Sequence, residues 1–187
     1  MENRTDDDTT PTAESALTQR VSGAEESWFD PRLEVRASSI QGQGVFATAV
    51  IQVGEQLVVE GGGGVVYSTQ DWATGTVRLD PEKYNEDQID DDLYRATLID
   101  MSYLFNHSCA PNMWGGVAQR VVHPGEEVTT DYALSIFAPA YCLAPCRCGA
   151  PGCRQRVTGN DWQRPDLQAR YSGHFPPFVQ RRIQRLG

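Results

Sequence analysis

Five cysteines are the residues of this chain best suited to bind a metal ion. Three of them, Cys146, Cys148 and Cys153, lie in CRCGAPGCR, where glycine and proline keep the segment compact enough for several thiolates to face one ion. A closed structural zinc site needs four ligands, so one must come from elsewhere, and Cys109 is the natural candidate. Reduced, buried structural cysteines are the alternative that this spacing leaves open.

Cys109 belongs to a second segment with reactive side chains, NHSCAPN, at residues 106–112. It places an amide, an imidazole, a hydroxyl and a thiol in four consecutive positions. By themselves, Asn106 and His107 are more often a hydrogen-bonded pair inside a core than a ligand-binding pair. Tyr132, in GEEVTTDY, is a further candidate, although an isolated tyrosine is by default a core residue whose hydroxyl has a partner.

Short strands broken by glycines are the elements that would position these segments. Runs rich in β-forming residues occur at LEVRA (33–37), GVFATAV (44–50), EQLVVE (55–60) and VVYS (65–68). The segment at 124–133 adds a turn followed by another strand. Near the C-terminus, Val179, Ile183 and Leu186 share one face of a predicted helix. The pattern therefore predicts a mostly β protein with C-terminal helices.

Acidic and basic residues are unevenly distributed along the chain. Sixteen basic and 25 acidic residues give a net charge of −9, which argues against direct nucleic-acid binding and permits a basic protein or an amine as partner. Residues 1–27 hold seven acids against two arginines, so we expect a disordered acidic tail. An acidic run at 80–92 and an arginine-rich stretch at 147–187 are either a solvated loop and helix pair or partner-binding surfaces.

Membrane and export signals are missing from the sequence pattern. No stretch approaches the roughly 18 to 20 apolar residues of a membrane helix. The N-terminal segment also lacks the basic start and apolar run of a signal peptide. We therefore expect a cytoplasmic protein with no membrane partner.

Four motifs occur in one order between residues 42 and 154. They are G-x-G-V-F-A at 42–47, N-H-S-C-x-P-N at 106–112, G-E-E-x-T-x-D-Y at 125–132 and C-x-C-G-x-x-x-C-R at 146–154. In these motifs the chain resembles a SET-domain protein-lysine methyltransferase with a post-SET zinc segment. The tail VTGNDWQRPDLQARYSGHF, at 157–175, further resembles small bacterial members of that family.

The resemblance implies a fold of short strands and small sheets around a pseudoknot, an exception to the rule against threading. In it, the NHSC segment and the segment ending in Asp-Tyr pass through one another, with a cofactor pocket on one side and a narrow substrate channel on the other. The implied domains are a SET domain at 28–140, a post-SET zinc segment at 141–160 and a C-terminal helical extension at 161–187.

The resemblance also implies the cofactors and the residues that hold them. S-adenosylmethionine would be bound by Gly42, Gln43, Gly44, Asn106, His107 and Tyr132. A structural zinc ion would be bound by Cys109, Cys146, Cys148 and Cys153, which leaves Cys142 free. Tyr132 would be the catalytic residue and would orient the amine or the methyl group without removing a proton, because the cofactor's positive charge and an apolar channel both disfavour an ammonium.

The substrate implied by the family is a protein with an accessible lysine. A tailoring enzyme that acts on a small metabolite is one alternative, and a catalytically idle SET fold that binds a partner is another. Three departures from the family pattern bear on this choice. Many members carry a further channel tyrosine where this chain runs into Glu60 and GGGG, the position of Thr130 is often aromatic, and the hairpin at 114–124 is short.

Overall fold

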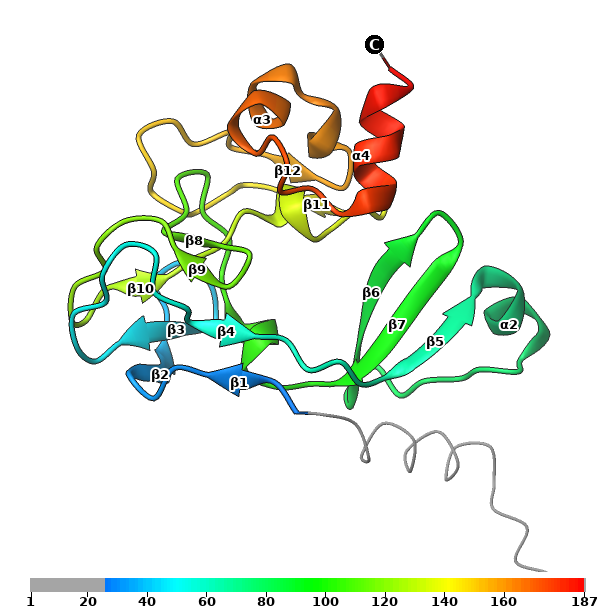
Figure 1. The fold of residues 1–187 in the computed structure, drawn as a ribbon, viewed down its shortest axis with the longest axis horizontal. Coiled ribbons are helices and arrows are strands. Elements are labelled where there is room, and N and C mark those ends of the chain that lie inside the picture. Colours follow the sequence, from blue (N-terminus) through cyan, green and yellow to red (C-terminus); the bar gives the residue numbers. More distant parts are fainter. Residues whose placement is uncertain (1–25, 187) are drawn as a thin grey trace, which may run out of the picture.

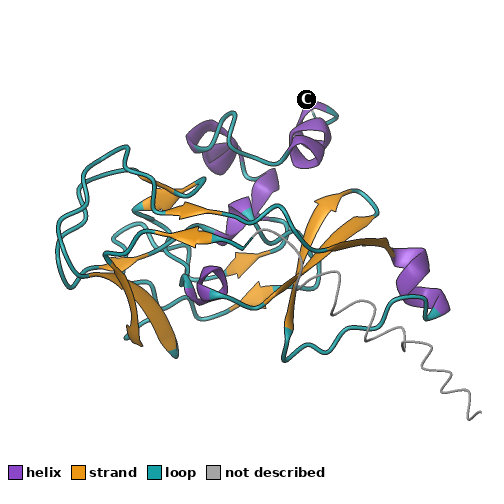
Figure 2. Ribbon diagram, turned by 60° about the horizontal axis from the view of Figure 1, so that its bottom comes forward, coloured by secondary structure: helices purple, strands orange, loops and turns teal. Residues whose placement is uncertain are grey.

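The computed structural model describes residues 26–186, so the predicted acidic tail lies outside the described residues except for Glu26 and Ser27. As the sequence predicts, most regular structure consists of short strands in small sheets, with few helices (Figure 1). Figure 2 shows that long loops connect these strands. In the described part of the chain, no helix has the length and apolar character needed to span a bilayer.

The central core forms around a three-stranded antiparallel sheet in the order β10-β3-β2. Its strands are β2 (Leu33–Ala37), β3 (Gln43–Ala47) and β10 (Glu127–Val128). In β3, Val45 and Ala47 face inward and are 0% and 1% exposed, the period of two that a half-buried strand requires. Two short pairs complete the core, β1 (Trp28–Phe29) with β4 (Val58–Val59), and β8 (Met113–Trp114) with β9 (Val117–Ala118).

A second sheet, in the order β5-β7-β6, lies to the right of this core in Figure 1. Its strands are β5 (Val65–Ser68), β6 (Tyr84–Asp90) and β7 (Leu93–Leu98). Helix α2 (Thr69–Thr74) follows β5 and begins with a capping box, in which Ser68 and Asp71 each accept the other's backbone N–H. Most of the acidic run at 80–92 therefore forms the strand β6 and is not a solvated loop. Its backbone pairs with β7, and this pairing does not depend on the charge of the side chains.

The C-terminal part packs on a cluster of its own. It comprises β11 (Cys142–Leu143), β12 (Val157–Thr158), the short 3-10 helix η3 (Asp161–Gln163), α3 (Pro165–Arg170) and α4 (Pro177–Gln184). Both α helices carry proline in the first turn, where a missing N–H costs nothing. On α4, Val179 is buried and Ile183 packs against the cluster, whereas Leu186 lies beyond the helix and is 62% exposed.

Candidate active site and metal centre

Backbone hydrogen bonds join the two segments that hold Asn106 and Tyr132. The N–H of Ser108 donates to the carbonyl of Thr130 at 2.8 Å, and the N–H of Thr130 donates to the carbonyl of Asn106 at 3.1 Å. His107 and Thr130 form a parallel bridge at the same place. Segments more than 20 residues apart are therefore fixed side by side, directly before the 3-10 helix η2 (Tyr132–Leu134).

The side-chain amide of Asn106 fastens the loop at 41–44 to this site. Its Nδ2 donates to the carbonyls of Gln41 and Gln43 at 3.1 and 2.9 Å and to the Glu127 carboxylate at 2.7 Å. A Cβ at Gly44 would collide with the Glu127 side chain, so the loop needs glycine there. The expected glycine-rich segment and Asn106 thus form one hydrogen-bonded unit.

A cavity of about 1830 Å³ opens beside this unit. Of the residues expected to bind a cofactor, Gln43, Asn106 and Tyr132 line it. Gly42, Gly44 and His107 are not among the described residues that line it. Typical small-molecule sites occupy roughly 300–1,000 Å³, so this open cavity is larger than a site for one small molecule.

Tyr132 presents its hydroxyl at the cavity wall. The hydroxyl donates to the carbonyl of Phe105 at 3.2 Å, just after the 3-10 helix η1 (Met101–Leu104). Burial, together with the neighbouring hydroxyls of Tyr141 and Tyr103, raises the pKa of Tyr132 to about 12. The group is therefore a neutral hydroxyl at physiological pH. Its lone pairs can accept a hydrogen bond, but it is no base.

Two further tyrosines surround Tyr132 in the cavity. The ring of Tyr141 meets that of Tyr132 edge-on, with centroids 6.3 Å apart. Tyr103, on η1, also lines the cavity and is 58% exposed. Neither stands where the family's further channel tyrosine was sought, after Glu60, yet both bring an aromatic hydroxyl near Tyr132.

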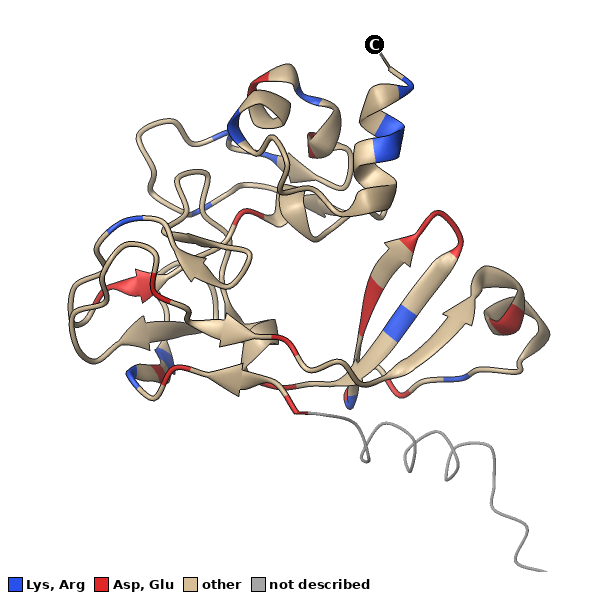
Figure 3. Ribbon diagram, viewed as in Figure 1, with Lys and Arg blue, Asp and Glu red and all other residues tan. Residues whose placement is uncertain are grey.

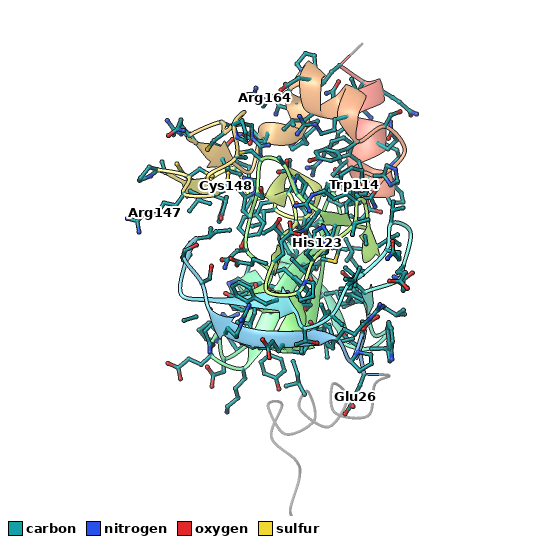
Figure 4. The ribbon with its side chains drawn as sticks, turned by 90° about the vertical axis from the view of Figure 1, so that its left-hand side faces the viewer. Glu26, Trp114, His123, Arg147, Cys148 and Arg164 are labelled. Atoms are coloured by element: carbon teal, nitrogen blue, oxygen red, sulfur yellow. The ribbon has the colours of Figure 1, made fainter. Side chains whose placement is uncertain are left out.

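Four thiols gather at the other end of the Asn106–Cys109 segment. Cys146, Cys148 and Cys153 lie in the loop that β11 and β12 close, and they pack with Cys109 in one buried cluster, called here the thiol cluster. Figure 4 shows Cys148 in this loop, with Arg147 pointing away from it. Cys142 lies outside the cluster and is exposed.

The thiol cluster also contains a potential fifth donor. Ligand atoms of His107, Cys109, Cys146 and Cys148 all lie within 4.8 Å of one another, so this group could hold a metal ion. Cys153 lies next to it, with its Sγ 3.8 Å from the carbonyl oxygen of Cys146. A tetrahedral site uses four ligands, and the structure offers five donor side chains.

Burial and backbone hydrogen bonds act on these thiols in opposite directions. Burial raises the pKa of Cys109 to about 11 and also raises that of Cys146. Burial opposes ionisation at Cys148 as well, but backbone N–H groups of Cys109 and Ala150 outweigh it and lower the pKa of Cys148 to about 7. Cys148 is thus the thiol most ready to act as a thiolate ligand.

Comparison with known proteins assigns the family. Residues 42–133, which hold the Gly42–Gly44 loop, Asn106 and Tyr132, match the family model described as the SET domain. This part of the chain belongs to the SET-domain family. Its fold and the order of its motifs agree with the resemblance seen in the sequence, whereas the small bacterial subtype stays a prediction.

Curated relatives of this SET-domain chain are histone-lysine methyltransferases. Histone-lysine N-methyltransferase ash1 of Drosophila melanogaster is 40% identical over 84 residues, which cover 36% of this chain and 4% of that protein. An H3 lysine-4 specific enzyme of Cryptococcus neoformans var. neoformans serotype D (strain B-3501A) is 29% identical over 145 residues, 66% of this chain and 9% of that protein. Another H3 lysine-4 specific enzyme, from Mycosarcoma maydis, is 29% identical over 151 residues, which cover 66% of this chain and 10% of that protein.

Among solved structures, the crystal structure of KRYPTONITE in complex with mCHG DNA and SAH aligns with this chain at a TM-score of 0.46 and 26% identity. The alignment covers 66% of this chain and 28% of that one. The SET-domain chain spans a tenth or less of the length of the curated relatives that it matches.

A buried ion-pair network behind the SET-domain site was missed by the sequence analysis. The Arg154 guanidinium binds both oxygens of Asp131 at 2.7 Å and lies 3.0 Å from Asp161. The hydroxyl of Tyr171 also donates to Asp131, at 2.9 Å. Burial raises the pKa of the Asp131 carboxyl, but hydrogen bonds from Arg154 and its charge outweigh burial and hold that pKa below its usual range. Asp131 and Arg154 each belong to one of the four motifs, yet no sequence signal pairs them.

The acidic and arginine-rich stretches, offered above as possible partner surfaces, contact each other. Arg181 and Arg182 on α4 pair with Asp90 and Asp91 at the tip of the β6–β7 hairpin, at 2.5 and 2.6 Å. Figure 3 shows the acidic hairpin tip and the basic side of α4 facing one another. The acidic and the arginine-rich stretch therefore neutralise part of each other's charge through ion pairs within the SET-domain chain.

Proposed function

We propose that this protein transfers a methyl group from S-adenosylmethionine to a lysine side chain of a protein. The observation that supports it most is the placement of the Tyr132 hydroxyl at the wall of a large cavity, next to the loop that Asn106 holds. Bound there, S-adenosylmethionine would supply a methyl group made electrophilic by its sulfonium. Gln43, Asn106 and Tyr132 fit such a ligand, because all three are polar residues that line the cavity.

Tyr132 would act by orienting the amine. A lysine amine has an ordinary pKa near 10.4, so it must release its proton to solvent water before it can attack. Tyr132 cannot take that proton, since its own hydroxyl is protonated. The hydroxyl already donates to Phe105, so its oxygen can accept an N–H of the neutral amine and direct the nitrogen lone pair toward the methyl group.

Charge in the cavity favours a basic protein segment as substrate. Six acidic side chains line the cavity against two arginines; the acids are Glu26, Glu60, Glu86, Asp87, Asp91 and Asp100. Both arginines are already engaged, Arg182 with Asp91 and Arg95 with Glu60. The remaining acids can therefore attract a lysine-bearing segment, and they disfavour nucleic acid at this face. We also propose that the methyl transfer takes place in the cytoplasm.

We propose that the thiol cluster binds one structural zinc ion through Cys109, Cys146, Cys148 and Cys153. Four buried or half-buried sulfurs suit a closed tetrahedral site, whose role would be to hold the loop against the Asn106–Cys109 segment. Elemental analysis of the purified chain should give one zinc per chain. Cys148→Ser should lose it, and Cys142→Ser should keep it. A folded parent with no metal, or zinc loss in Cys142→Ser alone, would contradict this ligand set.

Asn106→Ala is expected to weaken S-adenosylmethionine binding at least about tenfold. The parent should bind in the micromolar range, roughly −8 kcal/mol. The variant loses two hydrogen bonds that fix the Gln41–Gly44 loop and one to the Glu127 carboxylate, and each is worth about 1 kcal/mol. Titration calorimetry measures both affinities, with Asn160→Ala, at an exposed position outside the cavity, as the matched control. Equal affinity in Asn106→Ala and the parent would place the cofactor elsewhere.

Incubation of a cell extract with methyl-labelled S-adenosylmethionine separates this function from its alternatives. Label that the purified chain transfers to proteins supports protein methylation. Label confined to small molecules would favour the tailoring enzyme that acts on a metabolite. Cofactor binding without any transfer would favour a SET fold that acts only as a binding module.

A further inference from the structure

The imidazole of His107 reaches the thiol cluster from the side of the catalytic segment. It is 1% exposed, and its Nε2 lies 3.2 Å from the Sγ of Cys109. This distance fits a hydrogen bond to sulfur, and the same ring belongs to the group of donors that could hold a metal ion. His107 is therefore either a metal ligand or a hydrogen-bond donor to one.

The other ring nitrogen of His107 decides between these roles. Its Nδ1 accepts the backbone N–H of Tyr132 at 3.2 Å. A nitrogen that accepts an N–H carries no proton, and a neutral imidazole carries one proton on the other nitrogen. The proton of His107 therefore lies on Nε2. A protonated ring nitrogen has no free lone pair for a metal ion, so Nε2 can donate to Cys109 but cannot coordinate.

Cys109 is thus hydrogen-bonded by two N–H groups on its sulfur. Besides His107, the backbone N–H of Arg154 donates to Cys109 Sγ at 3.3 Å. Two donors stabilise the negative charge of a thiolate and fix its direction, which is how groups around a metal site tune its ligands. Arg154 also holds Asp131, the residue before Tyr132. Each of the two residues that donate to Cys109 therefore also contacts the segment that contains Tyr132.

We propose that His107 is a positioning residue, a neutral imidazole that joins the backbone N–H of Tyr132 to the Cys109 thiolate and stays off the metal. This role rests on the proposed function of Tyr132 and of the thiol cluster. It makes the placement of the catalytic tyrosine depend on whether the metal centre is loaded. It also resolves the choice among five donors in favour of the four cysteines.

Nuclear magnetic resonance of the metal-loaded, ¹⁵N-labelled full chain tests the proton position without any activity assay. Long-range ¹H–¹⁵N spectra identify the tautomer of each of three histidines, and His107→Gln identifies the signals of His107. We expect a protonated Nε2 and an unprotonated Nδ1. With ¹¹³Cd in place of zinc, we expect no coupling between the metal and either ring nitrogen. A protonated Nδ1, or a ¹¹³Cd–¹⁵N coupling at Nε2, would overturn the proposal.

Metal affinity tests the donor role on its own. His107→Phe keeps an aromatic ring but removes the donor, and it should weaken cobalt or zinc binding about 10- to 100-fold while the sulfur-to-cobalt absorption keeps its four-thiolate intensity. His107→Gln, whose amide N–H can reach the same sulfur, should restore part of the affinity. His123→Phe, at an exposed turn, is the matched control. Parent-like affinity in His107→Phe, or a change in the number of bound thiolates, contradicts the donor role.

Discussion

Arg154→Met is expected to lower the free energy of unfolding by about 3–5 kcal/mol. The guanidinium holds Asp131, whose side chain is fully buried, by two 2.7 Å hydrogen bonds, and it also faces buried Asp161. Methionine replaces the apolar stem of arginine but carries no charge, so both carboxylates would remain buried without their cation. The hydroxyl of Tyr171 and the backbone N–H of Ala133 cannot compensate, because each contributes only a neutral hydrogen bond to Asp131.

Arg164→Met supplies the matched control for this prediction. Arg164 pairs with Asp166 at 3.1 Å, but both side chains are about half exposed, so we expect a change below about 1 kcal/mol. Urea unfolding of metal-loaded protein gives both values. Similar losses in the two variants would mean that the network around Asp131 does not stabilise the fold in the way its burial indicates.

Tyr132→Phe is expected to lower methyl transfer at least 100-fold, about 2.7 kcal/mol of transition-state stabilisation. The change removes one oxygen and leaves the ring against His107 and Tyr141. Because the hydroxyl meets the amine as it approaches the methyl group, its loss should appear in turnover and hardly in cofactor affinity.

Tyr67→Phe is the control for this measurement, since Tyr67 is buried in a separate cluster on β5. Turnover and cofactor affinity of both variants are read by mass spectrometry of the product and by calorimetry. Parent-like turnover in Tyr132→Phe would remove this hydroxyl from the mechanism. Turnover lost equally in Tyr67→Phe would show that the assay reports general damage to the fold.

Local signals in the sequence predicted the parts of the site that depend on short spacing. Three cysteines within eight residues had to lie close together, and the glycines at 42 and 44 marked a turn. Gly42 has a positive φ there, and a side chain at position 44 would meet Glu127. The strands at 33–37 and 65–68 were predicted with the bounds that the structure shows, because their β-branched residues and flanking turns act locally.

Contacts between distant segments were not predictable in the same way. Asp131 and Arg154 are 23 residues apart, and Asp90 and Arg181 are 91 apart, so their pairing depends on the complete fold. His107 was expected at the cofactor pocket, but its ring turns toward Cys109, because the backbone N–H of Tyr132 and the thiol occupy its two nitrogens. The strand β6 was not predicted either, because its many acidic residues are untypical of a strand. Its residues pair with β7 through the backbone.

The position of the transferred methyl group tests the central claim most directly. The metal-loaded chain is incubated with a protein extract and S-adenosylmethionine that carries an isotopically labelled methyl group, and the digested proteins are analysed by mass spectrometry. The account predicts labelled methyl groups on lysine Nζ atoms with the parent and at least about 100-fold fewer with Tyr132→Phe. Label on other side chains only, or labelled lysine in equal amounts with both chains, would contradict it.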